Sequence, residues 1–248
     1  MQNKYAALVE QVREKKPLVH HITNYVTVND CANITLAIGA SPIMADASEE
    51  AATACALVLN LGTLNERTIP SMLAAGRAAN KAGIPVVFDP VGAGASKLRN
   101  EAAARILKEV KISSLRGNIS EIRFLAGRKS ATKGVDASED DLQNTADART
   151  ITKTLAARFH CITAITGATD VVSDGKTIVC IGNGHPMLAN LTGTGCMCSS
   201  LIGSFCGAAS DALLDATVAA LLSMGIAGEI AGEKAGQSGN GSFHTALH

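Results

Sequence analysis

Short apolar runs that end in Gly, Asn or Asp alternate with Ala-rich stretches of helical period through about the first two thirds of the chain. A strand that is covered on both faces reads as such a run, and the helix that follows it leads to the next parallel strand, so the alternation predicts βαβ units. Right-handed crossovers place these helices on both faces of one sheet. The expected strands cover residues 18–22, 41–44, 56–61, 85–88, 113–116 and 161–166.

The last third departs from this pattern. Residues 170–173 and 177–181 flank Asp174-Gly175, a dipeptide that favours a two-residue turn, so they predict a hairpin appended to the sheet. Two helices are expected after it, over residues 195–209 and from residue 211 to about 235, with Ser210 as the N-cap of the second. No linker or repeat divides the chain. The sequence therefore predicts one α/β domain over residues 1–248, with a mainly parallel sheet and a C-terminal hairpin and helices.

Charge and cysteine content narrow the function classes. The chain carries 22 basic and 22 acidic residues, so it offers no electrostatic footprint for nucleic acid or an anionic membrane. Seven cysteines, an odd number without a zinc-binding spacing, predict reduced thiols rather than disulfides. The N-terminus lacks the apolar run of a signal peptide, and the apolar stretch over residues 216–228 is too short to span a bilayer. We expect a soluble, cytoplasmic protein.

Ligands of open α/β sheets bind beyond the carboxyl ends of the strands. The TGTGC segment at residues 192–196 lies just before an expected helix, and Gly193 and Gly195 allow its backbone amides to turn inward. Such amides, together with the helix dipole, hold anions and stabilise charge on a transferring phosphoryl group. The alternative, a tight turn that permits close packing, remains open on this segment alone. Asp89, Arg116, Asn118 and Thr166 lie at other strand ends.

Cys196 begins the helix after the glycines, so we expect a lowered thiol pKa and a side chain aimed at the ligand, where it orients or deprotonates a hydroxyl. Asp89 follows a buried strand, and its carboxylate suits a magnesium ion and its waters. A turn-forming Asp before Pro90 explains that position equally well. Glu121 reads first as an acid in the opening turn of a helix capped by Ser120.

Other features carry less weight. His20, His21 and His185 have no partner at metal-ligand spacing. The acidic runs at residues 46–50 and 139–141 predict the first turns of helices.

Taken together, the tracts resemble the hydroxyethylthiazole kinases of the ribokinase-like superfamily over essentially the whole chain. The matching tracts are VHHITN (19–24), ND (29–30), GASPIMAD (39–46), FDPVGAG (88–94), RGNISEI (116–122), ITG (165–167), TGTGC (192–196) and GSF (241–243). Three positions depart from the family pattern and affect the expected pocket shape: His21, Ile119 and Asn240.

The resemblance implies a ribokinase-like fold that transfers the γ-phosphoryl group of ATP to the hydroxyl of a hydroxyethylthiazole in thiamine salvage. It also implies a homotrimer with substrate pockets between subunits. By the same resemblance, Met44, Asn24 and Gly193 border the thiazole. Arg116, Thr166 and Asn118 serve ATP, Asp89 and Glu121 hold Mg²⁺, and Gly193, Gly195 and Cys196 are the catalytic set.

Two other functions remain as alternatives. One is a dehydratase that repairs hydrated nicotinamide cofactors on the same architecture. Such enzymes resemble this chain in fold but keep Asp where Cys196 stands. The other is a sensor of thiazole compounds, which has no use for a magnesium site and a phosphate clamp.

Overall fold

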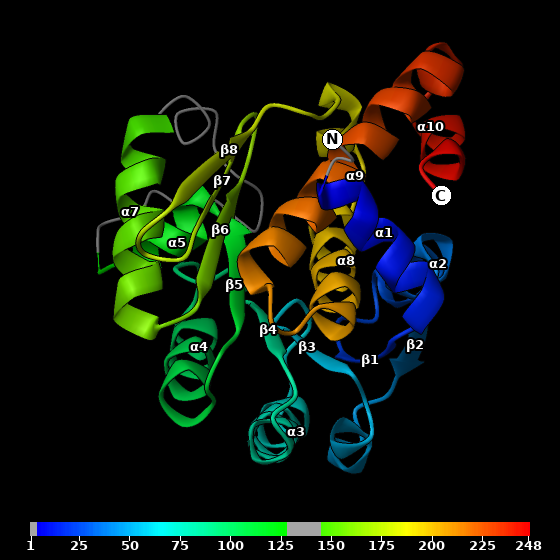
Figure 1. Ribbon diagram of the computed structural model, residues 1–248. Helices are drawn as coiled ribbons and strands as arrows, with labels where there is room; N and C mark the ends of the chain where they lie inside the picture. Colours follow the sequence, from blue (N-terminus) through cyan, green and yellow to red (C-terminus); the bar gives the residue numbers. More distant parts are fainter. Residues whose placement is uncertain (1–3, 128–144) are drawn as a thin grey trace.

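The computed structural model describes residues 4–127 and 145–248, and its strands form one eight-stranded sheet (Figure 1). The strand order is β2-β1-β3-β4-β5-β6-β7-β8. Strands β1 to β6 pair in parallel, and β7 and β8 pair antiparallel at one edge. The strands are β1 (Leu18–Ile22), β2 (Ser41–Met44), β3 (Ala56–Asn60), β4 (Val86–Asp89), β5 (Ser114–Asn118), β6 (Ile162–Thr166), β7 (Asp170–Ser173) and β8 (Ile178–Ile181).

The predicted fold class is confirmed: every expected strand is present, and β1, β2 and β7 have the expected bounds. The remaining strands begin or end one or two residues from the expected positions. Strand β3 shows why the apolar runs form central strands, because all five of its residues are buried. Val58 faces one core of the protein, whereas Leu57 and Leu59 face the other.

Helices cover both faces of the sheet, as predicted (Figure 1). One face carries α1 (Lys4–Lys15), α2 (Val28–Ile38), α8 (Thr194–Ala208) and α9 (Leu213–Ala235). The other carries α3 (Thr68–Ala82), α4 (Lys97–Glu109), α5 (Ile119–Leu125) and α7 (Thr145–Phe159). Shorter helices are η1 (Ser48–Ala52), η2 (Pro186–Asn190), η3 (Gly236–Ser238) and α10 (Asn240–Ala246). Glu49 and Glu50 lie in the first turn of η1, and the acidic run at residues 139–141 lies outside the described residues.

The hairpin is confirmed, but the expected two-residue turn is wrong. Ser173 pairs with Ile178, so the loop holds four residues. Oδ1 of Asp174 accepts hydrogen bonds from the backbone N–H groups of Lys176 (2.8 Å) and Thr177 (2.6 Å). These hydrogen bonds form a side-chain turn, so the loop extends beyond Asp174-Gly175, the dipeptide expected to make the whole turn.

Helix α9 differs from expectation in two respects. It begins at Leu213 after Ala212, without a side-chain cap, so Ser210 is not its N-cap. The apolar segment is also longer than expected: a continuous helical segment of 26 residues, Leu213–Ser238, has the length and composition to cross a membrane. Half of its apolar window is buried inside the protein, where α9 packs against α8, α1 and β7. The apolar side chains of α9 thus form part of one core of the protein.

Candidate active site

The carboxyl ends of the central strands bring polar side chains together against the start of α8. Asn60 ends β3 and pairs in register with Asp89, which ends β4. Asn118 ends β5 and pairs with Thr166, which ends β6. The expectation that these strand ends share one edge is therefore confirmed, and the edge faces the TGTGC segment.

Asp89 is the centre of this cluster and is fully buried. Its Oδ2 accepts hydrogen bonds from Ser199 Oγ (2.7 Å), Asn60 Nδ2 (3.0 Å) and Arg116 Nη1 (3.4 Å). Its Oδ1 is buried and has no hydrogen-bond partner among the described residues. Burial raises the pKa of Asp89, although the Arg116 charge and the hydrogen bonds act in the opposite direction.

Arg116 joins Asp89 to the next strand and to the glycine segment. Its Nη2 donates to Thr166 Oγ1 (2.5 Å) while Nη1 faces Asp89. Gly195 lies directly against the guanidinium, because a Cβ on this glycine would be 2.6 Å from Nη1. A residue with a side chain at position 195 would therefore displace the guanidinium.

Glu121 and Asn118 form a reciprocal cap at the start of α5. Asn118 Oδ1 accepts the Glu121 N–H (2.9 Å), and Glu121 Oε2 accepts the Asn118 N–H (2.8 Å). The N-cap is thus Asn118, and the expected Ser120 cap is wrong because Ser120 already lies within the helix. Glu121 Oε1 also accepts the Gly92 N–H (2.7 Å), which ties α5 to the turn after β4.

The Glu121 carboxylate is buried close to a second acid. Burial, followed by the negative charge of Asp89, raises the pKa of Glu121 to about 7. A cation between the two carboxylates relieves both effects, and the unpartnered Oδ1 of Asp89 leaves a ligand atom for it. These residues fit the oxygen-rich environment that Mg²⁺ prefers.

Cys196 lies in the first turn of α8, which begins at Thr194. Its Sγ accepts hydrogen bonds from the amide nitrogens of Asn24 (3.2 Å) and Asn60 (3.3 Å). The expected lowering of the thiol pKa is wrong. Burial, with the Asp89 charge acting in the same direction, raises the pKa of Cys196. A thiol whose pKa is raised above its ordinary value of 9.0 stays protonated near pH 7.

Gly193 is the N-cap of α8, with a positive φ of 91° and no side-chain cap. The first amides of α8 are therefore not capped by a side chain of the preceding residue. Thr27 closes the segment from the opposite side: a Cβ on Gly193 would lie 2.9 Å from Thr27 Cβ and closer still to its methyl group. Asn24 fixes Thr27, because Asn24 Oδ1 accepts both the N–H and the hydroxyl of Thr27 at 3.1 Å.

Met44 is not brought into the cluster. It is the last residue of β2, the edge strand, and pairs in register with His21 of β1. It is partly exposed, and two strands, β1 and β3, separate it from Asp89.

The three departures from the family pattern lie in different surroundings. His21 is buried, and burial lowers its pKa to about 4, so the ring is neutral. Ile119 is part of the core beneath α3 and α4. Asn240 is exposed at the start of α10 and donates to the Asn190 carbonyl (3.4 Å).

Sequence reasoning missed four residues of the site. Asn60 links Asp89 to Cys196, and the signal was present, since Asn60 ends an apolar run as Asp89 does. Ser199 lies one helical turn after Cys196, on the same face of α8. Asp170 accepts the Gly167 N–H (2.9 Å), and burial raises its pKa to about 6. Thr27 gave no signal, because its role depends on α2 and α8 meeting in space.

The arrangement has the parts that phosphoryl transfer requires. Two buried carboxylates suit a divalent cation, Arg116 offers a positive charge, and the start of α8 offers amides for an anion. A neutral thiol held by two amides lies beside them. Two surface depressions, lined in part by Asn80, Lys111 and Ile112, lie at the amino ends of β4 to β6, at the opposite edge of the sheet.

Comparison with known proteins identifies the relatives of this chain. The family model described as "Hydroxyethylthiazole kinase family" matches residues 9–248. The hydroxyethylthiazole kinase of Ruminiclostridium cellulolyticum is 62% identical over 208 residues, which cover 82% of this chain and 76% of that protein. The kinase of the same name from Clostridium beijerinckii is 62% identical over 213 residues, which cover 84% of this chain and 77% of that protein.

Solved structures agree with these sequence matches. The hydroxyethylthiazole kinase protein of Pyrococcus horikoshii superposes with a TM-score of 0.88 at 41% identity, over 98% of this chain and 91% of that chain. An ADP/ATP-dependent NAD(P)H-hydrate dehydratase from Bacillus subtilis superposes with a TM-score of 0.62 at 14% identity, over 95% of this chain and 88% of that chain. The second similarity shows a shared fold alone.

Proposed function

The chain belongs to the hydroxyethylthiazole kinase family, and its activity is the phosphorylation of the thiazole alcohol in thiamine salvage; from this premise we propose how its residues divide the work. The Asp89–Arg116–Thr166 network behind Gly195 is the observation that carries the proposal. It places a buried positive charge directly behind the amides that open α8. We assign this place to the γ-phosphate of ATP.

In this proposal the phosphates of ATP bind to Arg116, Thr166 and Asn118. The backbone of Gly193 and Gly195 holds the γ-phosphoryl group during its transfer. Charge on the equatorial oxygens of that group is the main feature that a protein stabilises in phosphoryl transfer. The amides and the guanidinium are fixed before substrate arrives, because Thr27 and Asp89 hold them. They therefore need little reorganisation during the reaction.

Asp89 and Glu121 hold Mg²⁺, together with the waters that Asn118 helps to place. The unpartnered Oδ1 of Asp89 and the raised pKa of Glu121 support this assignment. A bound magnesium ion supplies positive charge to the phosphate oxygens.

The thiazole hydroxyl attacks the γ-phosphorus in line, a new O–P bond forms, and the bond to the ADP oxygen breaks. Cys196 orients this hydroxyl by a hydrogen bond. Because its pKa is raised, a thiol rather than a thiolate faces the substrate, and it is a positioning group before it is a base. The alcohol proton leaves late, as a dissociative transition state allows, and passes to an oxygen of the transferred phosphoryl group.

The thiazole lies between subunits of a homotrimer, bordered by Asn24, Gly193 and Met44. Exposed apolar side chains support this placement. Tyr25 (77% exposed) and Val26 (60%) follow Asn24 directly, and Leu36 (57%) lies near the end of α2. A second copy of the chain is the occupant that we assign to this surface. Sedimentation should give three times the 25.4 kDa of one chain, and a monomer that turns over at the full rate would contradict the shared pocket.

The working protein in this proposal is a single kinase domain, soluble and cytoplasmic, that binds neither nucleic acid nor membrane. The equal numbers of basic and acidic residues support the absence of a polyanion surface.

Product analysis tests the proposed function. The purified protein is incubated with Mg-ATP and a panel of heteroaromatic alcohols that includes hydroxyethylthiazole and a hydroxymethylpyrimidine, and each product is identified by mass. We expect a phosphate on the thiazole alcohol and an equal amount of ADP. Hydrated NADH is added in a parallel reaction, and its repair without phosphorylation of the thiazole would overturn the assignment in favour of a dehydratase.

A further inference from the structure

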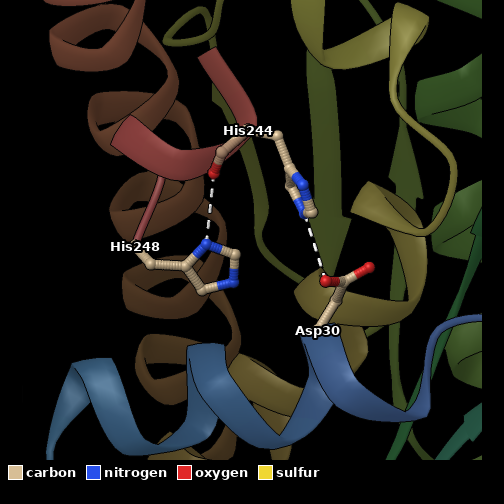
Figure 2. Close-up of side chains that lie close together, drawn as sticks. All are labelled: Asp30, His244 and His248. Carbon is tan, nitrogen blue, oxygen red and sulfur yellow. Dashed lines mark hydrogen bonds and ion pairs between the residues drawn. The ribbon is translucent and has the colours of Figure 1, made fainter. Parts of the chain in front are cut away.

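A second group of side chains with metal-binding chemistry lies away from the strand ends. It joins α2 to the C-terminal helix and consists of Asp30, His244 and His248 (Figure 2). Each residue offers one ligand atom, and these atoms lie within 4.8 Å of one another. From this geometry we propose a binding site for a borderline transition-metal ion of the Zn²⁺ class.

Asp30 and His244 present two potential ligand atoms to each other. Nε2 of His244 lies 3.1 Å from Oδ1 of Asp30, and the His244 ring points from α10 toward α2 (Figure 2). The contact is not aligned as a hydrogen bond, and this buried nitrogen has no hydrogen-bond partner among the described residues. A carboxylate oxygen and an imidazole nitrogen that face each other in this way have the chemistry of two metal ligands.

His248 completes the group from the turn after His244. The two histidines are four residues apart, which places them on one side of the chain as it leaves α10. Nδ1 of His248 lies 3.2 Å from the His244 carbonyl oxygen (Figure 2). A proton on Nδ1 donates to that carbonyl and leaves the lone pair of Nε2 for a metal. Metal-binding histidines commonly donate their second nitrogen in this way.

The donor set selects the metal. Two imidazoles and one carboxylate suit Zn²⁺, Co²⁺ or Ni²⁺, and the fourth position stays open to water. Mg²⁺ prefers an all-oxygen environment, so the magnesium of the kinase reaction does not compete for this site. Ligand atoms about 2 Å from a tetrahedral metal lie roughly 3.4 Å from one another. The Asp30 and His244 atoms, 3.1 Å apart, already meet this spacing, so the main movement falls to the exposed side chain of His248.

A bound ion would fasten α10 to α2. The first turn of α2 carries Asp30, and Thr27, the residue before α2, packs against Gly193 of the anion-binding segment. The proposed site therefore links the C-terminal helix to one wall of the active site.

Calorimetric titration of the full chain with Zn²⁺ alone tests the proposal. We expect one equivalent to bind to the unchanged protein, and His248→Ala to weaken binding at least about tenfold. His248 is exposed, so this variant should fold normally, and Asp30→Asn provides a second variant that keeps the shape and removes the charge. His160→Asn is the control, because it removes an exposed histidine and Asn tolerates the positive φ of 51° at that position.

Absorption of the Co²⁺ complex separates this site from the exposed thiols of Cys55 and Cys180, because a thiolate ligand adds an intense near-ultraviolet band. We expect no such band at one equivalent. Zn²⁺ should also raise the thermal midpoint of the unchanged protein and of His160→Asn, but not of His248→Ala. Absence of binding, equal binding by His248→Ala, or a thiolate band at one equivalent would each overturn the proposal.

Discussion

Two amide groups, from Asn24 and Asn60, hold Cys196 through hydrogen bonds to its Sγ. These bonds fix the position of the thiol, but they do not bring its pKa below the ordinary value. Asn60 also donates to Asp89, so the thiol and the buried carboxylate are joined by one side chain. The raised pKa of Cys196 follows from burial and from this neighbour. At the residue scale, the site is a network of fixed polar groups around an anion position.

Replacement of Cys196 by Ala should lower kcat about 10²-fold, the low end for loss of a general base, because the thiol mainly orients the hydroxyl. Gly193→Ala should cost more. A methyl group there meets Thr27, and a left-handed alanine adds about 1–2 kcal/mol of strain. Steady-state kinetics of both variants test this order, with the exposed Cys180→Ala as the control. An inactive Cys196→Ala beside a fully active Gly193→Ala would show that the roles are reversed.

Single residues were predictable where the chain itself places them. Asp89, Asn118 and Thr166 end strands, so the alternation of strand and helix in the sequence predicts that they share one edge of the sheet. The environment of a side chain was not predictable in the same way. The thiol pKa depends on burial and on Asp89, which lies 107 positions earlier in the sequence than Cys196. Thr27 and Ser199 entered the site only through packing between elements.

At the scale of elements, helix α4 holds the strand ends in place through Arg99. Nη1 of Arg99 donates to the carbonyls of Leu61 (2.5 Å) and Val91 (2.6 Å), and Nη2 donates to that of Gly62 (2.8 Å). These carbonyls belong to the segments that follow β3 and β4. Arg99 is therefore a positioning residue for Asn60 and Asp89, because its hydrogen bonds go to the segments that follow these residues and not to their side chains.

Arg99→Ala should lower kcat by up to about 10²-fold through misplacement of these segments, with a smaller change in the KM for the thiazole. It should also reduce the free energy of unfolding by about 1–3 kcal/mol, since three carbonyls lose a donor. Arg105→Ala on the same helix is the control, because among the residues that the structure describes Arg105 pairs at the surface with Glu109. Kinetics and denaturant unfolding measure both effects. Equal kinetic constants for the two variants would show that Arg99 is not a positioning residue.

Elements were predictable to within a residue or two because the strands are apolar on both faces. Their ends were less predictable, since caps and turns depend on local side-chain bonds. Asn118 replaced Ser120 as a cap through its reciprocal bond with Glu121, and Asp174 widened the hairpin loop. The start of α9 carries no side-chain cap, so no residue type could have marked it.

At the scale of the whole molecule, the fold buries more negative than positive charge at the site. Asp89 and Glu121 have raised pKa values, and Arg116 is the guanidinium between them and the glycine segment. A protein that keeps two acids in this state is expected to be stabilised by protons or by a cation.

The metal-free protein should therefore lose stability as pH rises. The folded pKa of Glu121, about 7, exceeds the unfolded value of 4.5, so the folded state binds more protons between these values. This contribution is complete below pH 4.5 and is lost by about pH 7, at a cost of a few kcal/mol. His20 and His21 act in the opposite direction because their pKa values are lowered.

The comparison of unchanged protein with Glu121→Gln isolates this contribution. Thermal unfolding between pH 5 and pH 8 should show that the unchanged protein loses stability relative to Glu121→Gln as pH rises. Addition of Mg²⁺ at pH 8 should raise the midpoint of the unchanged protein and leave that of the variant almost the same. Parallel pH profiles for the two proteins would contradict the raised pKa.

The most direct measurement of the central claim is a crystal structure of the protein with Mg²⁺ and a non-hydrolysable ATP analogue. We expect the terminal phosphate to accept hydrogen bonds from the amides that open α8 and from Arg116, with the metal on Asp89. A terminal phosphate at the opposite edge of the sheet, in the depressions beside Asn80 and Lys111, would contradict it.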